Sequence, residues 1–318
     1  MRAIFDAHCD TISEIYNKNL FLNKNTLQLD LERMEMYDAY IQIFAAFVDK
    51  KSISTTPFNH CVALIDKYHK EVEKNKNRIS AIENAKQLES AINNGGIHSV
   101  LSIEGGEALM GSEEAIYMFY KLGVRLITLT WNYANEIADG ITEARGGGLT
   151  EFGKKAVKIM EDLGILIDVS HISERGFWDV AENTKYPFVA SHSCVKGICG
   201  HKRNLSDEQI KEIISRRGCV GINFYPEFLS DGGICGAEKI VDHIKYILKL
   251  GGENSIGLGS DFDGVDSLPH GISGIQDMSK VIRLMEVSGI PAETIDKITY
   301  KNFYRVFCET LSRENKKI

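Results

Sequence analysis

Two side chains able to bind a metal ion, His8 and Asp10, end an apolar run at residues 4–10. In an extended strand, residues i and i+2 point to the same side, so this imidazole and this carboxylate can face one ion. A lone His-x-Asp pair is weak evidence, because many occur by chance. Later apolar runs, however, end in residues of the same kind, namely Glu104, His171, His192 and Asp261. These strand ends together predict one metal-centred pocket.

The five residues His8, Asp10, Glu104, His171 and His192 exceed what one catalytic zinc needs, since such a zinc takes three protein ligands. They suit two ions about 3.5–4 Å apart that share one bridging carboxylate. Glu104 is the natural bridge, because a carboxylate offers two oxygens. Imidazole and carboxylate ligands without committed thiolates favour zinc, with manganese or cobalt as alternatives. We therefore predict two zinc-type ions per chain.

Asp261 and Arg203 have the chemistry to act on a substrate. A carboxylate beside the metals can take a proton from the attacking water and return it to the leaving group. We assign this role to Asp261, because its competitor Asp263 precedes Gly264 and is typical of a turn. Arg203 follows the His192 strand on a loop and can bind a carboxylate through two hydrogen bonds. The alternative for Arg203 is an ordinary surface arginine.

The cysteines and the remaining histidines lie in less specific surroundings. Seven cysteines without a CxxC pair favour reduced thiols in a cytoplasmic protein. Cys9 and Cys194 adjoin proposed ligands and are candidate ligands or nucleophiles, although a small buried cysteine is the commoner state. We expect structural roles for six histidines, three on helix-like stretches (His60, His69, His243) and three in loops (His98, His201, His270).

Composition and charge exclude several classes of protein. The 318 residues are 43% hydrophobic and 25% charged, which is ordinary for a globular protein. The net charge of −7 disfavours binding to nucleic acid, whose phosphates demand a basic face. The chain leads from Met1 straight into an apolar strand, and its apolar runs are too short for a bilayer. We therefore expect neither a signal peptide nor a membrane anchor.

Strand-like and helix-like segments alternate along the chain. Amphipathic helix-like stretches occur near 61–68, 152–163, 206–217 and 237–250, and a last helix over 292–311 is expected to pack outside the strands. Ser206 and Gln209 form the pattern of a capping box. The strand-like segments number eight, at about 2–8, 39–48, 99–104, 125–131, 165–170, 187–191, 218–224 and 255–260.

Eight strand–helix units with apolar strands predict an α/β fold, a single (β/α)8 TIM barrel over 1–318. The alternative is a doubly wound open sheet. The barrel is favoured because no glycine-rich phosphate loop follows the first strand. It is also favoured because the polar residues end strands from first to last, and a barrel gathers those ends around one mouth.

Seven motifs resemble those of the membrane dipeptidase (renal dipeptidase) family of zinc metallopeptidases, in order and spacing, over almost the whole chain. They are DAHCD (6–10), IEGG (103–106), DVSH (168–171), SHS (191–193), RNLSD (203–207), INFY (222–225) and GSDFDG (259–264). The resemblance implies a (β/α)8 barrel with two zincs, usually in a dimer. It places one zinc on His8 and Asp10 and the other on His171 and His192, with Glu104 bridging.

The resemblance also implies roles toward a dipeptide substrate. Arg203 and the region of Tyr225 would hold its C-terminal carboxylate, and Asp261 would orient the water and carry its proton. Members of the family cleave dipeptides and often accept a D-residue at the second position. The chain departs from the animal members at the end of the fourth predicted strand. Trp131 stands where they carry a histidine thought to stabilise the oxyanion, and Asn132 is the alternative donor.

Three functions follow in order of preference. The first is a cytoplasmic binuclear dipeptidase, a homodimer acting on free dipeptides. The second is a barrel metallohydrolase of another amide or a lactone, which Arg203 disfavours because a free substrate carboxylate explains that residue. The third is a metal-binding protein without peptidase activity, which Asp261 disfavours because metal storage needs no proton shuttle.

Overall fold

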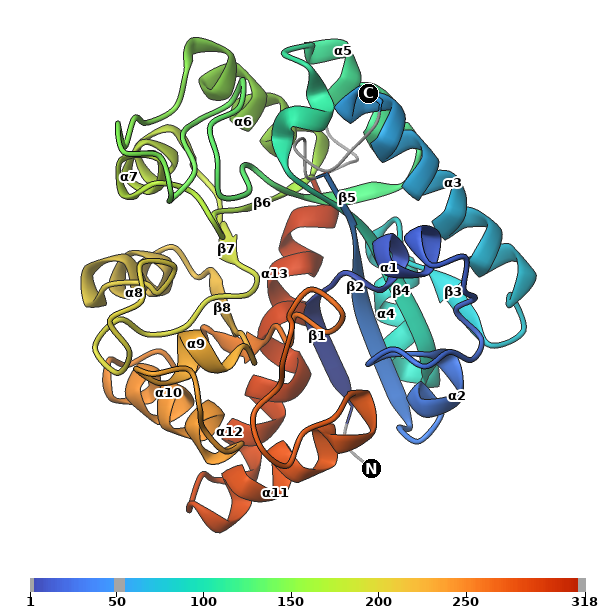
Figure 1. The fold of residues 1–318 in the computed structure, drawn as a ribbon, viewed down its shortest axis with the longest axis vertical. Coiled ribbons are helices and arrows are strands. Elements are labelled where there is room, and N and C mark those ends of the chain that lie inside the picture. The colour runs from blue at the N-terminus through green and yellow to red at the C-terminus, as the bar shows by residue number, and fades with distance from the viewer. Residues whose placement is uncertain (1–2, 49–54, 314–318) are drawn as a thin grey trace.

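Eight parallel strands close into a barrel in the computed structural model, which describes residues 3–48 and 55–313. Strand β1 pairs with β2 on one side and with β9 on the other, and β2 pairs directly with β4. From β4 to β9 the neighbours follow chain order (Figure 1). The barrel strands are β1 (Ile4–Cys9), β2 (Ala39–Phe47), β4 (Gly96–Glu104), β5 (Val124–Thr128), β6 (Leu166–Asp168), β7 (Val189–Ala190), β8 (Cys219–Ile222) and β9 (Ile256–Leu258).

These strands match the eight predicted segments, so the barrel is confirmed and the open sheet is wrong. The sequence did not predict a ninth strand, β3 (Ile79–Ala81), which pairs with the first half of β4. Strand β5 pairs with the second half of β4, from Leu101 onward. Because β4 begins at Gly96, His98 lies in a strand, and its predicted loop position is wrong.

Helices surround the strands, and the predicted helical segments are all present (Figure 1). The capping box at the start of α8 is confirmed, since Ser206 and Gln209 each accept a hydrogen bond from the other's backbone N–H. The helices are α1 (Thr11–Asn17), α2 (Leu31–Met34), α3 (Pro57–Lys74), α4 (Ala85–Asn94), α5 (Glu113–Lys121), α6 (Glu151–Leu163), α7 (Glu174–Asn183), α8 (Asp207–Ser215), α9 (Pro226–Leu229), α10 (Glu238–Lys249), α11 (Met278–Val287), α12 (Ala292–Asp296) and α13 (Asn302–Leu311).

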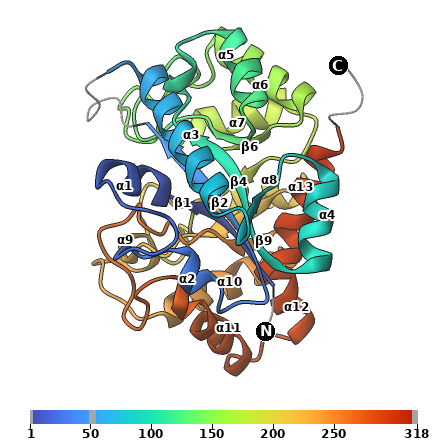
Figure 2. The same ribbon diagram turned by 90° about the vertical axis from the view of Figure 1, so that its right-hand side faces the viewer.

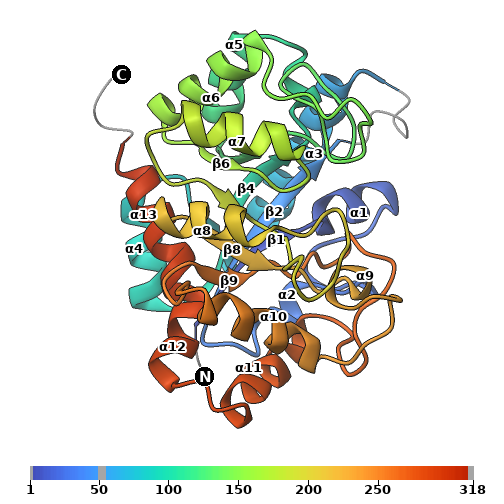
Figure 3. The ribbon, with the colours of Figure 1, turned by 90° about the vertical axis from the view of Figure 1, so that its left-hand side faces the viewer.

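The last predicted helix lies outside the ring of strands and covers the end of the barrel where the strands begin. A π-helical turn at Lys297–Lys301 joins α12 to α13. Phe303 and Phe307 of α13 stack on Phe5 of β1, with ring centroids 5.8 and 5.3 Å away. Gly257 of β9 leaves room for this packing, since a Cβ there would lie 2.3 Å from the Phe303 ring. Figures 2 and 3 show α13 and α4 on one side of the barrel and α1 and α9 on the opposite side.

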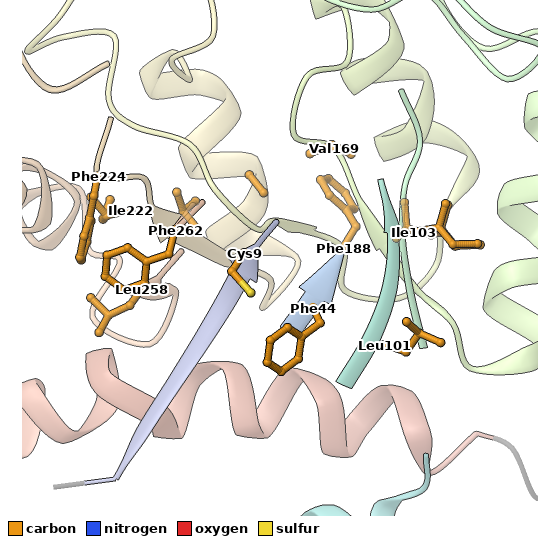
Figure 4. Close-up of a cluster of buried hydrophobic side chains, with 14 of the residues drawn as sticks. Cys9, Phe44, Leu101, Ile103, Val169, Phe188, Ile222, Phe224, Leu258 and Phe262 are labelled. Carbon is orange, nitrogen blue, oxygen red and sulfur yellow. The ribbon is translucent and has the colours of Figure 1, made fainter. Parts of the chain in front are cut away.

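The strands are apolar on both faces, as predicted for a parallel barrel. Inward-facing side chains near the covered end form one buried cluster, which includes Phe5, Ile43 and Leu126. Outward-facing side chains form a second cluster against the helices, part of which is drawn in Figure 4 with Phe44 and Phe188. The interior at the other end, beside α1 and α9, is therefore the place where polar side chains gather.

The described residues carry no helix that combines the length and the apolar character of a membrane span. The seven cysteines are unpaired, and all but Cys308 are buried. Burial raises the pKa of the Cys9 and Cys194 thiols, so both favour the protonated state. Both cysteines pack in the outward-facing apolar cluster, which agrees with the more common of the two predicted alternatives.

Candidate metal centre

A β-bulge in β1 turns His8 into the barrel. Between Asp6 and Cys9, β1 contains one residue more than the paired segment of β2, so the alternation of inner and outer side chains shifts. Ala7 packs with the inner apolar cluster, while His8 stacks on His192 with ring centroids 3.9 Å apart. Asp10 follows directly after the strand, and its Oδ1 lies 3.9 Å from His8 Nε2. The predicted pair therefore does face one point.

Glu104, at the end of β4, lies between the histidines. Its Oε1 is 3.1 Å from His171 Nε2 and 3.3 Å from His192 Nε2. Its other oxygen, Oε2, is 3.3 Å from His8 Nε2. The carboxylate is buried, and its two oxygens face two different sets of imidazoles. The structure thus brings all five predicted metal ligands together around this one side chain.

Hydrogen bonds at the far side of two rings fix which nitrogen faces Glu104. His171 Nδ1 lies 2.8 Å from Asn132 Oδ1, which can only accept, so Nδ1 carries the proton. His192 Nδ1 lies 2.7 Å from Ser191 Oγ, which donates to Asp168 Oδ2 at 2.6 Å. The Ser191 hydroxyl therefore accepts from His192. Both Nε2 lone pairs then point to the centre, the arrangement typical of metal-ligating histidines.

We expect Ser191→Ala to weaken divalent-metal binding about 10–100-fold, because the His192 ring loses the partner that orients it. The measurement is a zinc titration of the metal-stripped protein, which does not depend on activity. Ser102→Ala is the matched control, since the Ser102 hydroxyl is also buried and also donates a hydrogen bond, but to the Phe44 carbonyl. Equal metal affinity in the two variants would contradict the role of Ser191.

The electrostatics of the cluster favour a cation. Burial would lower the pKa of His8, but the charges of Glu104, Asp10 and Asp261 outweigh it and raise the pKa to about 10. Burial would raise the pKa of Glu104, but the charge of His8 and the close approach of His171 and His192 hold it well below its usual range. Burial, followed by the charge of Arg203, places the pKa of His171 well below its usual value. At neutral pH Glu104 is therefore ionised and His171 is neutral, whereas His8 carries a proton that a bound cation would replace.

These residues fit a divalent metal. In the described part of the chain, His8 Nε2 and Asp10 Oδ1 are buried and have no hydrogen-bond partner. A buried polar atom without a partner costs about 1–3 kcal/mol, so a ligand for them is expected. His171 Nε2 and His192 Nε2 lie 2.8 Å apart with their lone pairs facing each other. A bound cation would satisfy the buried atoms that lack a partner and would also remove the repulsion between the two Nε2 lone pairs.

Asp261 lies beside this cluster, after β9, with its Oδ1 3.8 Å from His8 Nε2. Asn223 Nδ2 donates to its Oδ2 at 2.8 Å and so holds the carboxylate in place. Asp261 and His171 adopt left-handed backbone conformations, with φ of 61° and 68°. Such conformations are uncommon for residues other than glycine and concentrate at functional sites.

Asp263 has a different environment, in agreement with its interpretation as a turn residue. Thr11 Oγ1 and the Gln28 backbone N–H each donate to its carboxylate at 2.6 Å. Both Asp263 oxygens therefore accept hydrogen bonds that link its turn to the start of α1 and to the segment at Gln28. Gly264 is required next to it, because a Cβ there would lie 2.3 Å from Asp261 Oδ1 and 2.5 Å from Asp10 Oδ2.

The Arg203 side chain is buried, with 6% exposure, so the alternative that it is an ordinary surface arginine is wrong. Its Nη2 donates to the His192 carbonyl at 3.2 Å, and its guanidinium lies 5.4 Å from the centroid of the Phe228 ring. Among the described residues, no carboxylate lies within ion-pair distance, and Arg203 Nε has no hydrogen-bond partner. Arg203 lines a small cavity of about 40 Å³, together with His171 and Ser193.

A cavity of about 190 Å³ opens beside the metal cluster. Trp131 and Tyr225 line it, as do Glu104 and Asp261. Trp131 packs edge-on against Phe47, with ring centroids 5.2 Å apart. Asn132 also lines the cavity, but its Oδ1 accepts from His171, so it can donate to a substrate only through Nδ2. The structure thus gathers the predicted substrate-binding residues, with Arg203 in the adjoining cavity.

The other six histidines lie outside the cluster, and two examples show why. In α10, His243 has hydrogen-bond distances of 3.0 Å to both the Val195 N–H and the Leu229 carbonyl. His69 in α3 contacts the Leu122 carbonyl at 2.9 Å. These rings join neighbouring segments and carry structural roles, as predicted.

Sequence reasoning missed the residues that support the ligands. Asp6 accepts from the Ser260 N–H at 2.8 Å and from its hydroxyl, which fixes the chain just before Asp261. Asp168 holds Ser191, just before His192, in the same way. Burial raises the pKa of Asp6 to about 6, with opposing hydrogen bonds from Ser260. The sequence signal that could have revealed these supporting contacts is a serine immediately before each of two functional residues, Ser191 before His192 and Ser260 before Asp261.

Comparison with known proteins gives a consistent set of matches. A family model described as membrane dipeptidase, peptidase family M19, matches residues 2–317. An uncharacterised dipeptidase of Schizosaccharomyces pombe is 32% identical over 310 residues, covering 91% of this chain and 74% of that protein. The dipeptidase aclJ of Aspergillus oryzae is 35% identical over 219 residues, covering 67% of this chain and 51% of that protein.

Two solved structures are similar over nearly their full length. Dipeptidase AC, a metallopeptidase of family M19, superposes with a TM-score of 0.90 at 26% identity, covering 98% of this chain and 99% of that one. A metallopeptidase from Rhodobacter sphaeroides, bound to a phosphinate mimic of the dipeptide L-Ala-D-Ala, gives 0.89 at 25% identity, covering 97% and 99%.

Proposed function

Because the chain belongs to the membrane dipeptidase family, peptidase family M19, we propose that it is a binuclear zinc dipeptidase acting on unblocked dipeptides. Membership makes the protein a metallopeptidase that hydrolyses dipeptides. It also makes the third predicted function, metal binding without peptidase activity, wrong. The number and identity of the metals, and the preferred dipeptide, are the parts that we propose.

The observation that carries the binuclear proposal is the position of Glu104. One carboxylate oxygen faces His171 and His192, and the other faces His8. A carboxylate placed in this way suits a bridge between one ion on His8 and Asp10 and another on His171 and His192. The donor set of imidazoles and carboxylates suits zinc, with manganese or cobalt as alternatives.

The mechanism assigns separate tasks to this chain's residues. When bound, divalent ions polarise the scissile carbonyl and lower the pKa of water. Asp261, held by Asn223, accepts the proton of the attacking water at Oδ1 and returns it to the leaving amine. Asn132 Nδ2 can donate to the carbonyl oxygen as its charge develops. Trp131 and Phe47 form an apolar wall that limits water in the cavity.

Arg203 provides a reason for acting on free dipeptides. A buried guanidinium that lacks a carboxylate partner among the described residues is suited to a substrate carboxylate, which it binds through two charge-assisted hydrogen bonds. Tyr225, on the same side of the cavity and packed on Phe228, can add a third contact. The alternative substrates, other amides or lactones, offer Arg203 no such group.

We expect a dipeptide to be cleaved at least about 10²-fold more efficiently than its C-terminal amide, because each hydrogen bond to a charged group contributes about 1.5–3 kcal/mol. The measurement compares kcat/KM for Ala-Ala and Ala-Ala-amide. In Arg203→Lys, KM for the dipeptide should rise strongly, since a point charge does not reproduce the fork. Equal hydrolysis of both substrates by the unmodified protein would favour the broader amide or lactone hydrolase.

We also propose that the enzyme accepts a D-residue at the C-terminal position. The support is the similar Rhodobacter sphaeroides enzyme, whose ligand mimics L-Ala-D-Ala. Metal analysis of the purified protein, combined with a screen of L-L and L-D dipeptides, tests metal content and chirality together. Homodimerisation and a cytoplasmic location stay predictions, to be tested by light scattering and by cell fractionation.

A further inference from the structure

We propose that a groove beside the catalytic cavity binds the side chain of the substrate's N-terminal residue, and that Asp266 makes a cationic side chain the preferred one. This inference rests on the proposed dipeptidase function and adds a substrate class to it. Its central residue, Asp266, lies outside the motifs of the sequence analysis.

The groove has a volume of about 690 Å³ and opens directly from the catalytic cavity. Asp10, Phe47 and the segment 264–266 line both spaces, so they form the passage between them. Gly264 keeps this passage open, because a Cβ there would lie 2.5 Å from Asp10 Oδ2. A substrate group that extends past Asp10 therefore enters the groove.

The orientation of the bound dipeptide follows from the positions at which its two ends would bind. Arg203 lies on the side of His171 and His192, where it receives the C-terminal carboxylate. Asp10 lies on the opposite side of Glu104, next to His8. With the scissile bond over Glu104, the N-terminal residue lies toward Asp10. Its side chain is then the group that reaches the groove.

The charges along the described lining are mostly negative. Apart from the proposed metal ligand Asp10, the side chains of Glu14, Asp263 and Asp266 contribute carboxylates, against the single ammonium of Lys18. Lys18 is already paired with Glu14, at 2.5 Å. Burial lowers the pKa of His60, the remaining titratable group of the lining, so this imidazole favours the neutral state. The groove therefore presents a negative potential to a substrate side chain.

Asp266 is the carboxylate in a position to use that potential. It is exposed, it lines both spaces, and no cation among the described residues lies within ion-pair distance of it. The carboxylate of Asp263, by contrast, is engaged by Thr11 and Gln28. Phe47 and Leu27 offer apolar surface along the way. Lysine and arginine side chains match this pattern, because their stems are apolar and their tips are charged.

The test compares Lys-Ala with norleucine-Ala, which has the same carbon chain without the ammonium group. We expect kcat/KM to be about 5-fold higher for Lys-Ala at low ionic strength, the upper end for an exposed ion pair, and the ratio to fall with salt. Asp266→Asn should bring the ratio close to one. The control Asp242→Asn removes an exposed carboxylate of α10 that pairs with Lys239, and it should keep the preference.

Two outcomes would overturn the inference while the dipeptidase function stands. One is equal cleavage of the two substrates by the unmodified protein. The other is a preference for Lys-Ala that persists in Asp266→Asn. Failure to cleave any free dipeptide, in protein with its full metal content, would instead overturn the proposed function and this inference with it.

Discussion

Glu104→Gln is expected to abolish dipeptide hydrolysis and to weaken both metal sites at once. The amide keeps one accepting oxygen and replaces the other by an NH2 group, which cannot bind a cation. Because the two oxygens of Glu104 face His8 on one side and His171 and His192 on the other, one of the two sets loses its carboxylate. Two bound ions would also lose the negative charge of the carboxylate that Glu104 would supply between them.

Metal content provides the measurement, since it is independent of turnover. We expect about two zinc ions per chain in the unmodified protein and less than one in Glu104→Gln after equal dialysis, with the fold retained by circular dichroism. Glu107→Gln is the matched control, because Glu107 is also buried in the adjoining 3-10 turn but contacts Asn135. One ion per active chain, unchanged by Glu104→Gln, would exclude the binuclear site.

The sequence was sufficient to predict the barrel and the side chains that gather at its mouth, for a physical reason. Parallel strands in a barrel are buried on both faces, so each appears as an apolar run, and its C-terminal end reaches one common mouth. A histidine or acid that ends such a run must lie at that mouth. His8, Glu104 and His192 were therefore recognisable without coordinates, and the structure places them within contact of one another.

Features that depend on register and on long-range contacts were beyond the sequence. The bulge in β1 changes which side chains face inward, yet nothing in the run 4–10 marks it. Buried hydrogen bonds link Ser191 to Asp168 and Ser260 to Asp6. The partners of the first bond are far apart in the sequence, and those of the second lie near opposite ends of the chain. The short strand β3 has three residues, too few for a periodic pattern.

The assignment of Arg203 shows the same limit at one residue. From sequence alone, an arginine on a loop is as well explained by a solvent-exposed position as by a role in binding a substrate. Its burial excludes the surface alternative and supports the proposed substrate role, because an isolated buried charge is costly without a partner. The groove at Asp266 is a further case, since its lining comes from six separate stretches of the chain and residue types alone do not bring them together.

Asp261→Asn is expected to keep its metal and to lose turnover by a factor of about 10²–10⁴, the usual size of a general acid–base contribution. That factor corresponds to about 2.7–5.5 kcal/mol in the activation free energy. The substitution suits the test, because asparagine also tolerates the left-handed backbone found at this position, with φ of 61°. Asn223 can still contact the new side chain, but an amide cannot accept a proton near neutral pH.

Asp263→Asn separates proton transfer from structural support, because the two carboxylates lie two residues apart. Asp263 holds Thr11 and Gln28, so its loss should lower stability by about 1–3 kcal/mol while kcat stays close to that of the unmodified protein. For Asp261→Asn we expect the reverse, a small change in Tm and a large fall in kcat. The two variants are compared by thermal unfolding, zinc content and kcat on one dipeptide. Near-normal kcat in metal-loaded Asp261→Asn, with a large loss in Asp263→Asn, would transfer the proton-carrying role to Asp263.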